Sequence, residues 1–109
     1  MIQQISIISN KLLTLFISDM LQSVSITVKG IVQGVYYRQR TKDTALRAGI
    51  TGEIKNTPDG DVHIVATGTE QQLQDFVKWC NKGPETAVVS DVIVQTIPLK
   101  NFDSFRIVR

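Results

Sequence analysis

The sequence is poor in the residues that build disulfides, metal centres and histidine-based catalytic sites. Among its 109 residues it has a single cysteine, Cys80, and a single histidine, His63. One cysteine cannot form an internal disulfide, so a reducing compartment, the cytoplasm, is expected. One histidine disfavours both a typical zinc site and a histidine-based triad. Any zinc site or histidine-based triad would have to be unusually poor in ligands.

Strong charge and long apolar runs are also missing. The net charge is only +2, which by itself indicates neither a nucleic-acid partner nor a membrane partner. The apolar stretch at residues 12–17 is too short to cross a bilayer, and it lacks the basic start and the cleavage site of a secretory signal. We expect residues 1–22 to be a poorly ordered extension or the result of a mis-set start codon, in preference to a functional anchor. Residues 23–109 are expected to form one domain with its own core.

Hydrophobic periodicity predicts the order of the secondary-structure elements. Alternation of apolar and polar residues predicts strands at residues 23–29 and 62–67. β-Branched residues predict another strand at residues 88–96, and further strands are expected at residues 50–56 and 104–108. Helical spacing predicts one helix at residues 37–48, which Gly49 ends. A second helix is predicted to begin at Thr69, which can form a capping box with Gln72. The turn sequence TPDG at residues 57–60 predicts a hairpin between the second and third strands.

This order, β-α-β-β-α-β, is the split βαβ arrangement of a ferredoxin-like α/β sandwich. We expect an α+β fold with one antiparallel sheet, both helices on one face, and a short extra C-terminal strand. Leu73, Phe76, Val77 and Cys80 form the apolar stripe of the second helix. Cys80 is therefore expected to be a buried core thiol.

The stretch GIVQGVYYRQRT, residues 30–41, contains the best candidate site. Arg38 and Arg40 stand where a helix begins, although the partial positive charge there disfavours cations by about 0.3–1 kcal/mol each. Gly30 and Gly34 allow the backbone to turn its N–H groups toward an anion, which the helix N-terminus also favours. The planar guanidinium of Arg38 could then hold a phosphoryl group. No lysine follows the second glycine as in a P-loop, and a plain glycine turn with a solvated arginine is the alternative.

Two stretches of the sequence resemble the signatures of the acylphosphatase family. Residues 28–38, VKGIVQGVYYR, are similar to the first signature. Residues 52–62, GEIKNTPDGDV, are similar to the second signature, which Gly68 closes. The resemblance continues at Trp79, residues 82–84 and residues 105–107. It thus covers the whole predicted domain.

The resemblance implies a small ferredoxin-like enzyme that hydrolyses carboxyl–phosphate mixed anhydrides without a metal. It implies that Arg38 holds the phosphate and that Asn56 orients the attacking water. It also implies a phosphate-binding loop made by Val32, Gln33, Gly34, Val35, Tyr36 and Tyr37 together with Arg38. The implied partners are a small acyl phosphate as substrate and inorganic phosphate as product, with no nucleic acid, no membrane and a monomeric chain.

The sequence departs from the family pattern in two places. The family usually has Phe or Met where Tyr37 stands, and a buried tyrosine hydroxyl needs a hydrogen-bond partner. It usually has an aromatic residue where Glu53 stands and a smaller residue in place of Ile54. Two other functions fit the same elements: a non-catalytic anion- or protein-binding domain, and an RNA-binding module. The RNA-binding module is disfavoured because the central strands offer Glu53, Ile54, His63 and Val65 and no aromatic run for stacking bases.

Overall fold

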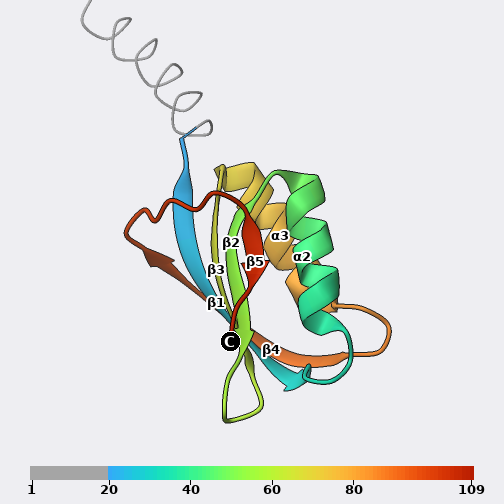
Figure 1. Cartoon of the computed structure of the whole chain (residues 1–109). Coiled ribbons are helices and arrows are strands. Elements are labelled where there is room, and N and C mark those ends of the chain that lie inside the picture. The colour runs from blue at the N-terminus through green and yellow to red at the C-terminus, as the bar shows by residue number, and fades with distance from the viewer. Residues whose placement is uncertain (1–19) are drawn as a thin grey trace, which may run out of the picture.

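The computed structural model describes residues 20–109, which form two helices and five strands (Figure 1). The strands are β1 (Gln22–Ile31), β2 (Thr51–Asn56), β3 (Val62–Gly68), β4 (Val88–Ile97) and β5 (Phe105–Ile107). The helices are α2 (Tyr37–Ala48) and α3 (Glu70–Lys82), and neither is long and apolar enough to span a membrane. All the predicted elements are present. The expectation of a poorly ordered extension falls on residues outside the described range, apart from the last three.

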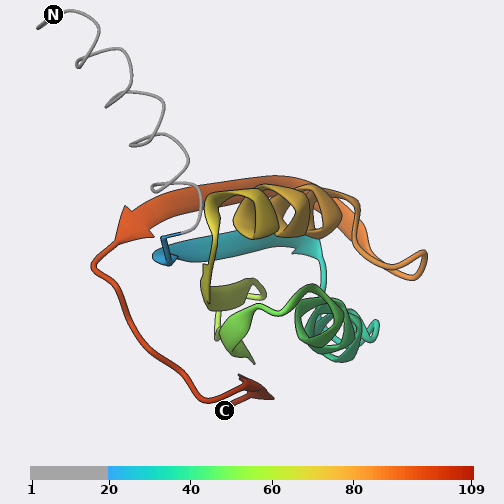
Figure 2. The ribbon, with the colours of Figure 1, turned by 90° about the horizontal axis from the view of Figure 1, so that it is seen from above.

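The five strands form one sheet in the order β4-β1-β3-β2-β5. The first four strands pair antiparallel, as predicted, whereas β5 pairs parallel to β2. The extra C-terminal strand therefore makes the sheet mixed instead of wholly antiparallel. Both helices cover the same face: α3 lies against β1, β3 and β4, and α2 lies against β2 and β5 (Figure 2). The architecture is the predicted ferredoxin-like sandwich.

The core lies between the sheet and the two helices. Its strand residues include Val24, Ile26, Val28, Ile54, Val62, Ile64, Ala66 and Phe105, and its helix residues include Tyr37, Ala45, Leu73, Phe76 and Cys80. The predicted burial of Cys80 is confirmed. Ile54 is fully buried on the helix side of β2, so its assignment to a surface that could meet RNA was wrong. Successive residues of a strand point to opposite faces of the sheet, and Gly52 and Ile54 share the buried face of β2.

The strands β1, β2 and β5 run in the same direction and end at the same end of the sheet. Since β3 is antiparallel to both β1 and β2, the strands β1 and β2 run the same way, and β5 joins them by pairing parallel to β2. Their carboxyl ends therefore lie at one end of the sheet (Figure 1). The segment after β1, the hairpin turn after Asn56, and the residues after Ile107 all leave from this end.

Candidate active site

The loop between β1 and α2 has a backbone suited to holding an anion. Gly34 (φ 72°) and Tyr36 (φ 63°) both adopt the left-handed region. Left-handed residues placed alternately along a chain turn successive N–H groups to one side, which creates an anion-binding nest. Tyr36 is also the N-cap of α2 and provides no side-chain cap. The free N–H groups of the first helical turn therefore face the same region as the loop.

Gly30 has a different role from the predicted one. It lies within β1, next to a register shift between Lys29 and Gly30, and it pairs with Val89 of β4. A Cβ atom at this position would collide with the carbonyl oxygen of Val88, and the backbone has φ 130°. Gly30 thus permits the close approach of β4, and of the two glycines only Gly34 shapes the loop.

A cavity of about 420 Å³ opens against this loop. It is lined by Val32, Gly34, Tyr36, Tyr37, Arg38 and Gln39, together with Ile107 and Arg109 from the C-terminal segment. The residues with charged side chains in the lining are Arg38 and Arg109, and no Asp or Glu is among them. Within residues 20–109 the only ion pair joins Lys29 to Asp61, so the half-buried Arg38 has no carboxylate partner there. The cavity is electropositive and has the size of a small-molecule site.

Asn56 is the last residue of β2 and pairs with Val62 of β3. Among the side chains of residues 20–109, its Oδ1 is the one buried polar atom without a hydrogen-bond partner. Buried polar atoms are nearly always paired, so this oxygen marks a place for a polar ligand such as water. Asn56 is not among the residues that line the loop cavity. Asn56 lies at the same end of the sheet as this cavity, and another residue connects Asn56 with the loop.

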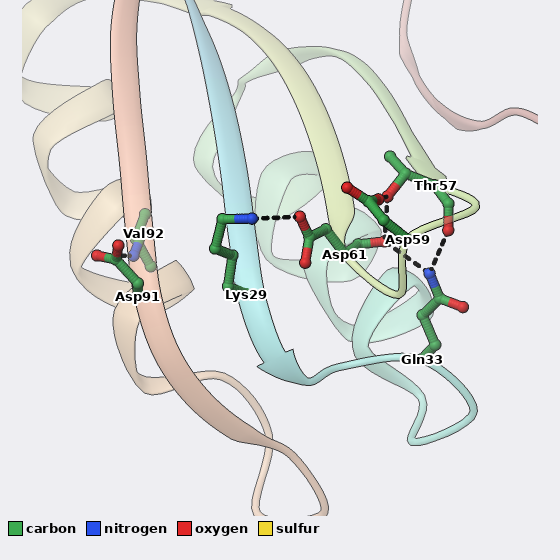
Figure 3. Close-up of polar contacts among 7 residues, drawn as sticks. All are labelled: Lys29, Gln33, Thr57, Asp59, Asp61, Asp91 and Val92. Carbon is green, nitrogen blue, oxygen red and sulfur yellow. Dashed lines mark hydrogen bonds and ion pairs between the residues drawn. The ribbon is translucent and has the colours of Figure 1, made fainter.

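The side chain of Gln33 makes this connection (Figure 3). Its Nε2 donates hydrogen bonds to the carbonyl oxygens of Thr57, at 2.8 Å, and Asp61, at 2.7 Å. Because Thr57 directly follows Asn56, these bonds hold the loop at a fixed position relative to Asn56. From the sequence, Gln33 was expected only to be part of the phosphate-binding loop. A primary amide with two donors inside a loop of apolar residues was the signal for its further role.

The hairpin that receives Gln33 is itself held together by polar contacts (Figure 3). Thr57 N–H donates to the Asp61 carbonyl oxygen at 2.9 Å, and the Thr57 hydroxyl donates to the Asp59 carboxylate. Lys29 of β1 pairs with the Asp61 carboxylate at 2.7 Å. The hydrogen bond and charge of Asp61 raise the pKa of Lys29, and the Thr57 hydroxyl lowers the pKa of Asp59. Asp59 thus acts within the hairpin, whereas the Asp61 side chain ties the hairpin to β1.

Tyr37 is anchored to the other helix. Its buried hydroxyl donates to the backbone carbonyl oxygen of Cys80 at 2.7 Å, in the last turn of α3 where carbonyl groups lack helical partners. Its ring packs against Trp79 with centroids 5.7 Å apart, and Gly83 leaves room for that ring. Burial, followed by the proximity of Cys80, raises the pKa of Tyr37. The hydroxyl that distinguishes Tyr37 from Phe or Met thus has a hydrogen-bond partner. This bond fixes the start of α2 beside Arg38.

Arg40 belongs to a neighbouring cavity. That cavity is lined by Tyr36, Arg40, Trp79, Lys82, Gly83, Pro84, Glu85 and Thr86. Tyr36, which is 75% exposed, contributes to both cavities and stands between them. The two arginines at the start of α2 therefore line different cavities, and of these two only Arg38 lines the loop cavity.

Comparison with known proteins agrees with the resemblance seen in the sequence. The family model described as Acylphosphatase matches residues 24–107. The acylphosphatase of Marinobacter nauticus is 49% identical over 80 residues, which cover 72% of this chain and 87% of that protein. The structure of the acylphosphatase from Bacillus subtilis matches with a TM-score of 0.78 at 36% identity, over 83% of this chain and all of that one (100%). The acylphosphatase from Coxiella burnetii matches with a TM-score of 0.77 at 33% identity, over 80% of this chain and 92% of that one. The chain belongs to the acylphosphatase family.

Proposed function

We propose that this chain hydrolyses the carboxyl–phosphate bond of small acyl phosphates to a carboxylate and inorganic phosphate. The catalytic residues of this proposal are Arg38 and Asn56. The observation that carries it is the position of Arg38, a guanidinium without a carboxylate partner among residues 20–109, in an electropositive cavity beside a nest-forming loop. Membership of the acylphosphatase family supports the reaction class.

In this proposal the phosphoryl group sits in the loop and contacts Arg38. The loop residues that contribute are Val32, Gln33, Gly34, Val35, Tyr36 and Tyr37. The transition state of phosphoryl transfer is loose, and its negative charge is spread over the equatorial oxygens. Backbone N–H groups and a guanidinium already directed at those oxygens stabilise that charge without reorganising.

The attacking water is assigned to Asn56. Its unpartnered Oδ1 can accept a hydrogen bond from water and so direct a water lone pair at phosphorus, in line with the leaving group. The new bond joins the water oxygen to phosphorus, the bond from phosphorus to the carboxylate oxygen breaks, and the water proton passes to a phosphoryl oxygen. The leaving group is the conjugate base of an acid with a pKa of about 4, so it departs as an anion without a general acid.

The same proposal includes the setting of the enzyme. It assigns catalysis to a domain at residues 23–109, with no metal, cofactor or nucleic-acid partner, and to a monomer in the cytoplasm. The lone cysteine, Cys80, supports a reducing compartment. Hydrolysis of benzoyl phosphate that continues in excess EDTA would support metal independence, and loss of turnover that Mg²⁺ restores would contradict it.

Replacement of Arg38 is the central test. Arg38→Ala is expected to lower kcat/KM for benzoyl phosphate by roughly 10²–10³-fold, because removing one donor to a transition-state oxyanion costs about 2.7–4 kcal/mol. Arg40→Ala is the matched control, since it removes the same charge from the neighbouring cavity and is expected to keep wild-type turnover. Inorganic phosphate should inhibit the wild type competitively. An Arg38→Ala variant with wild-type activity would end the proposal.

A further inference from the structure

We infer that Arg109 binds the acyl half of the substrate, and that the enzyme favours acyl phosphates whose acyl group carries a second negative charge. The inference rests on the proposed function and names a substrate class for the same cavity. It comes from the presence of a second arginine among the residues that line the cavity.

The fold brings Arg109 to the site through β5. Ile107 of β5 pairs with Ile54 of β2, and the N–H of Val108 continues the ladder by donating to the Ile54 carbonyl oxygen at 2.9 Å. The next residue, Arg109, therefore follows the direction of β2 toward the end of the sheet where Asn56 lies. Because β1 runs the same way, its following loop begins at this end too.

The charges in the cavity leave Arg109 available to a ligand. Arg38 is assigned to the phosphoryl group, no Asp or Glu lines the cavity, and within residues 20–109 Arg109 makes no ion pair. A space of about 420 Å³ falls within the range of sites that take whole small molecules, so it has room for more than a phosphoryl group. Guanidinium pairs with carboxylate and phosphate through two parallel hydrogen bonds. An anionic group on the acyl half therefore suits Arg109 better than a neutral one.

The test compares substrates that differ only in charge. Carboxybenzoyl phosphates, with the carboxylate at ring position 3 or 4, are matched with the corresponding carbamoylbenzoyl phosphates, which have the same shape without the charge. The rigid ring prevents the carboxylate from attacking the mixed anhydride of its own molecule. The measured quantity is the discrimination ratio, which is kcat/KM for the carboxylate divided by kcat/KM for the amide. We expect a ratio above one for the wild type with at least one isomer.

Three variants separate Arg109 from the overall charge of the protein. Arg109→Gln is expected to lower the discrimination ratio by about two- to fivefold, the range of a solvent-exposed charge pair, and Arg109→Lys is expected to keep part of it. The matched control is Arg106→Gln, because Arg106 is an exposed arginine of β5 that lines a different cavity with Glu53. This control changes the net charge equally and should keep the wild-type ratio.

The outcomes distinguish the inference from the proposed function. An Arg109→Gln variant with the wild-type ratio for both isomers, or an Arg106→Gln variant with an equal loss, would overturn the inference. Turnover of benzoyl phosphate by the wild type would still support the proposed function in that case. If the wild type hydrolysed none of these acyl phosphates, the proposed function would fail and the inference would fail with it.

Discussion

Two adjacent residues at the start of α2 are held in opposite ways. Tyr37 is 1% exposed, and both its ring and its hydroxyl have partners on α3. Arg38 is half-buried in a cavity lining that has no Asp or Glu, and it makes no ion pair within residues 20–109. Tyr37 therefore sets the position of the backbone from which the side chain of Arg38 extends. At the scale of single residues, Tyr37 sets the position of the proposed site, and the chemistry proposed for it is assigned to Arg38.

Removing the hydroxyl of Tyr37 tests this anchoring. Tyr37→Phe is expected to lower the free energy of unfolding by about 1–3 kcal/mol, because the buried Cys80 carbonyl loses its side-chain donor while the ring is kept. Tyr36→Phe is the control, since Tyr36 is largely exposed and should change stability little. Urea denaturation followed by Trp79 fluorescence measures both. Equal stability of the two variants would show that the bond to α3 contributes nothing.

The thiol of Cys80 is expected to make the free energy of unfolding fall as the pH rises in the alkaline range. Burial raises its pKa from 9.0 to about 12, and the proximity of the Tyr37 hydroxyl opposes this rise only in part. Above pH 9 the unfolded thiol loses its proton while the folded thiol keeps it, so the unfolded state binds fewer protons and stability falls as pH rises. The expected slope is up to about 1.4 kcal/mol per pH unit, between the two pKa values. The raised pKa of Tyr37 acts in the same direction.

Denaturation curves at pH 8, 9, 10 and 11 measure this slope. The Cys80→Ala variant is expected to be less stable at every pH, because it leaves a cavity in the core. Its free energy of unfolding should nevertheless decline less steeply with pH than that of the wild type. Identical slopes for the two proteins would contradict the assignment to the thiol.

At the scale of elements, the β1–α2 loop and the β2–β3 hairpin act as one unit through Gln33. Gln33→Met keeps the length of the side chain but removes both donors to the hairpin carbonyl oxygens. We expect kcat to fall by about tenfold, with a smaller change in the inhibition constant of phosphate, because small errors of alignment reduce rate strongly. Gln71→Met, on the exposed face of α3, is the control and should leave both constants unchanged.

A double-mutant cycle separates positioning from a general loss of structure. If Gln33 acts by aligning the loop with Asn56, then Gln33→Met should cost much less in an Asn56→Ala background than in the wild type. Additive effects on kcat would show that the two residues act independently. The free energy of unfolding of each variant, measured in parallel, accounts for any contribution from stability.

The elements whose signals are local were predicted from the sequence. The alternation of Val24, Ile26 and Val28 specifies β1 by itself, and Thr69 with Gln72 forms the predicted capping box. The candidate loop was also found, because glycines and an arginine before a helix are a local pattern. The parallel pairing of β5 was not predicted, since its direction depends on the path of residues 98–104. The partners of Gln33 were missed for the same reason, because both lie on another element.

At the scale of the whole molecule, the cavity and its surroundings are built from segments far apart in the sequence. The loop follows β1, Asn56 ends β2 and Arg109 follows β5, and the common direction of these strands brings them to one end of the sheet. Only the β2–β3 hairpin in this group is a local structure. The site therefore needs every strand of the β1-β3-β2-β5 order to be in place.

The parallel pairing of β5 with β2 also has a consequence for how fast activity can appear after denaturation. Pairings between distant segments raise the contact order of a chain and are slow to form, because the loops between them must close first. Val108 can donate to Ile54 only after most of the chain has been brought together. In refolding after rapid dilution from urea, we expect benzoyl phosphate hydrolysis to return with the rate constant of Trp79 fluorescence. Activity that returned earlier would mean that a partly folded chain already holds a working phosphate site.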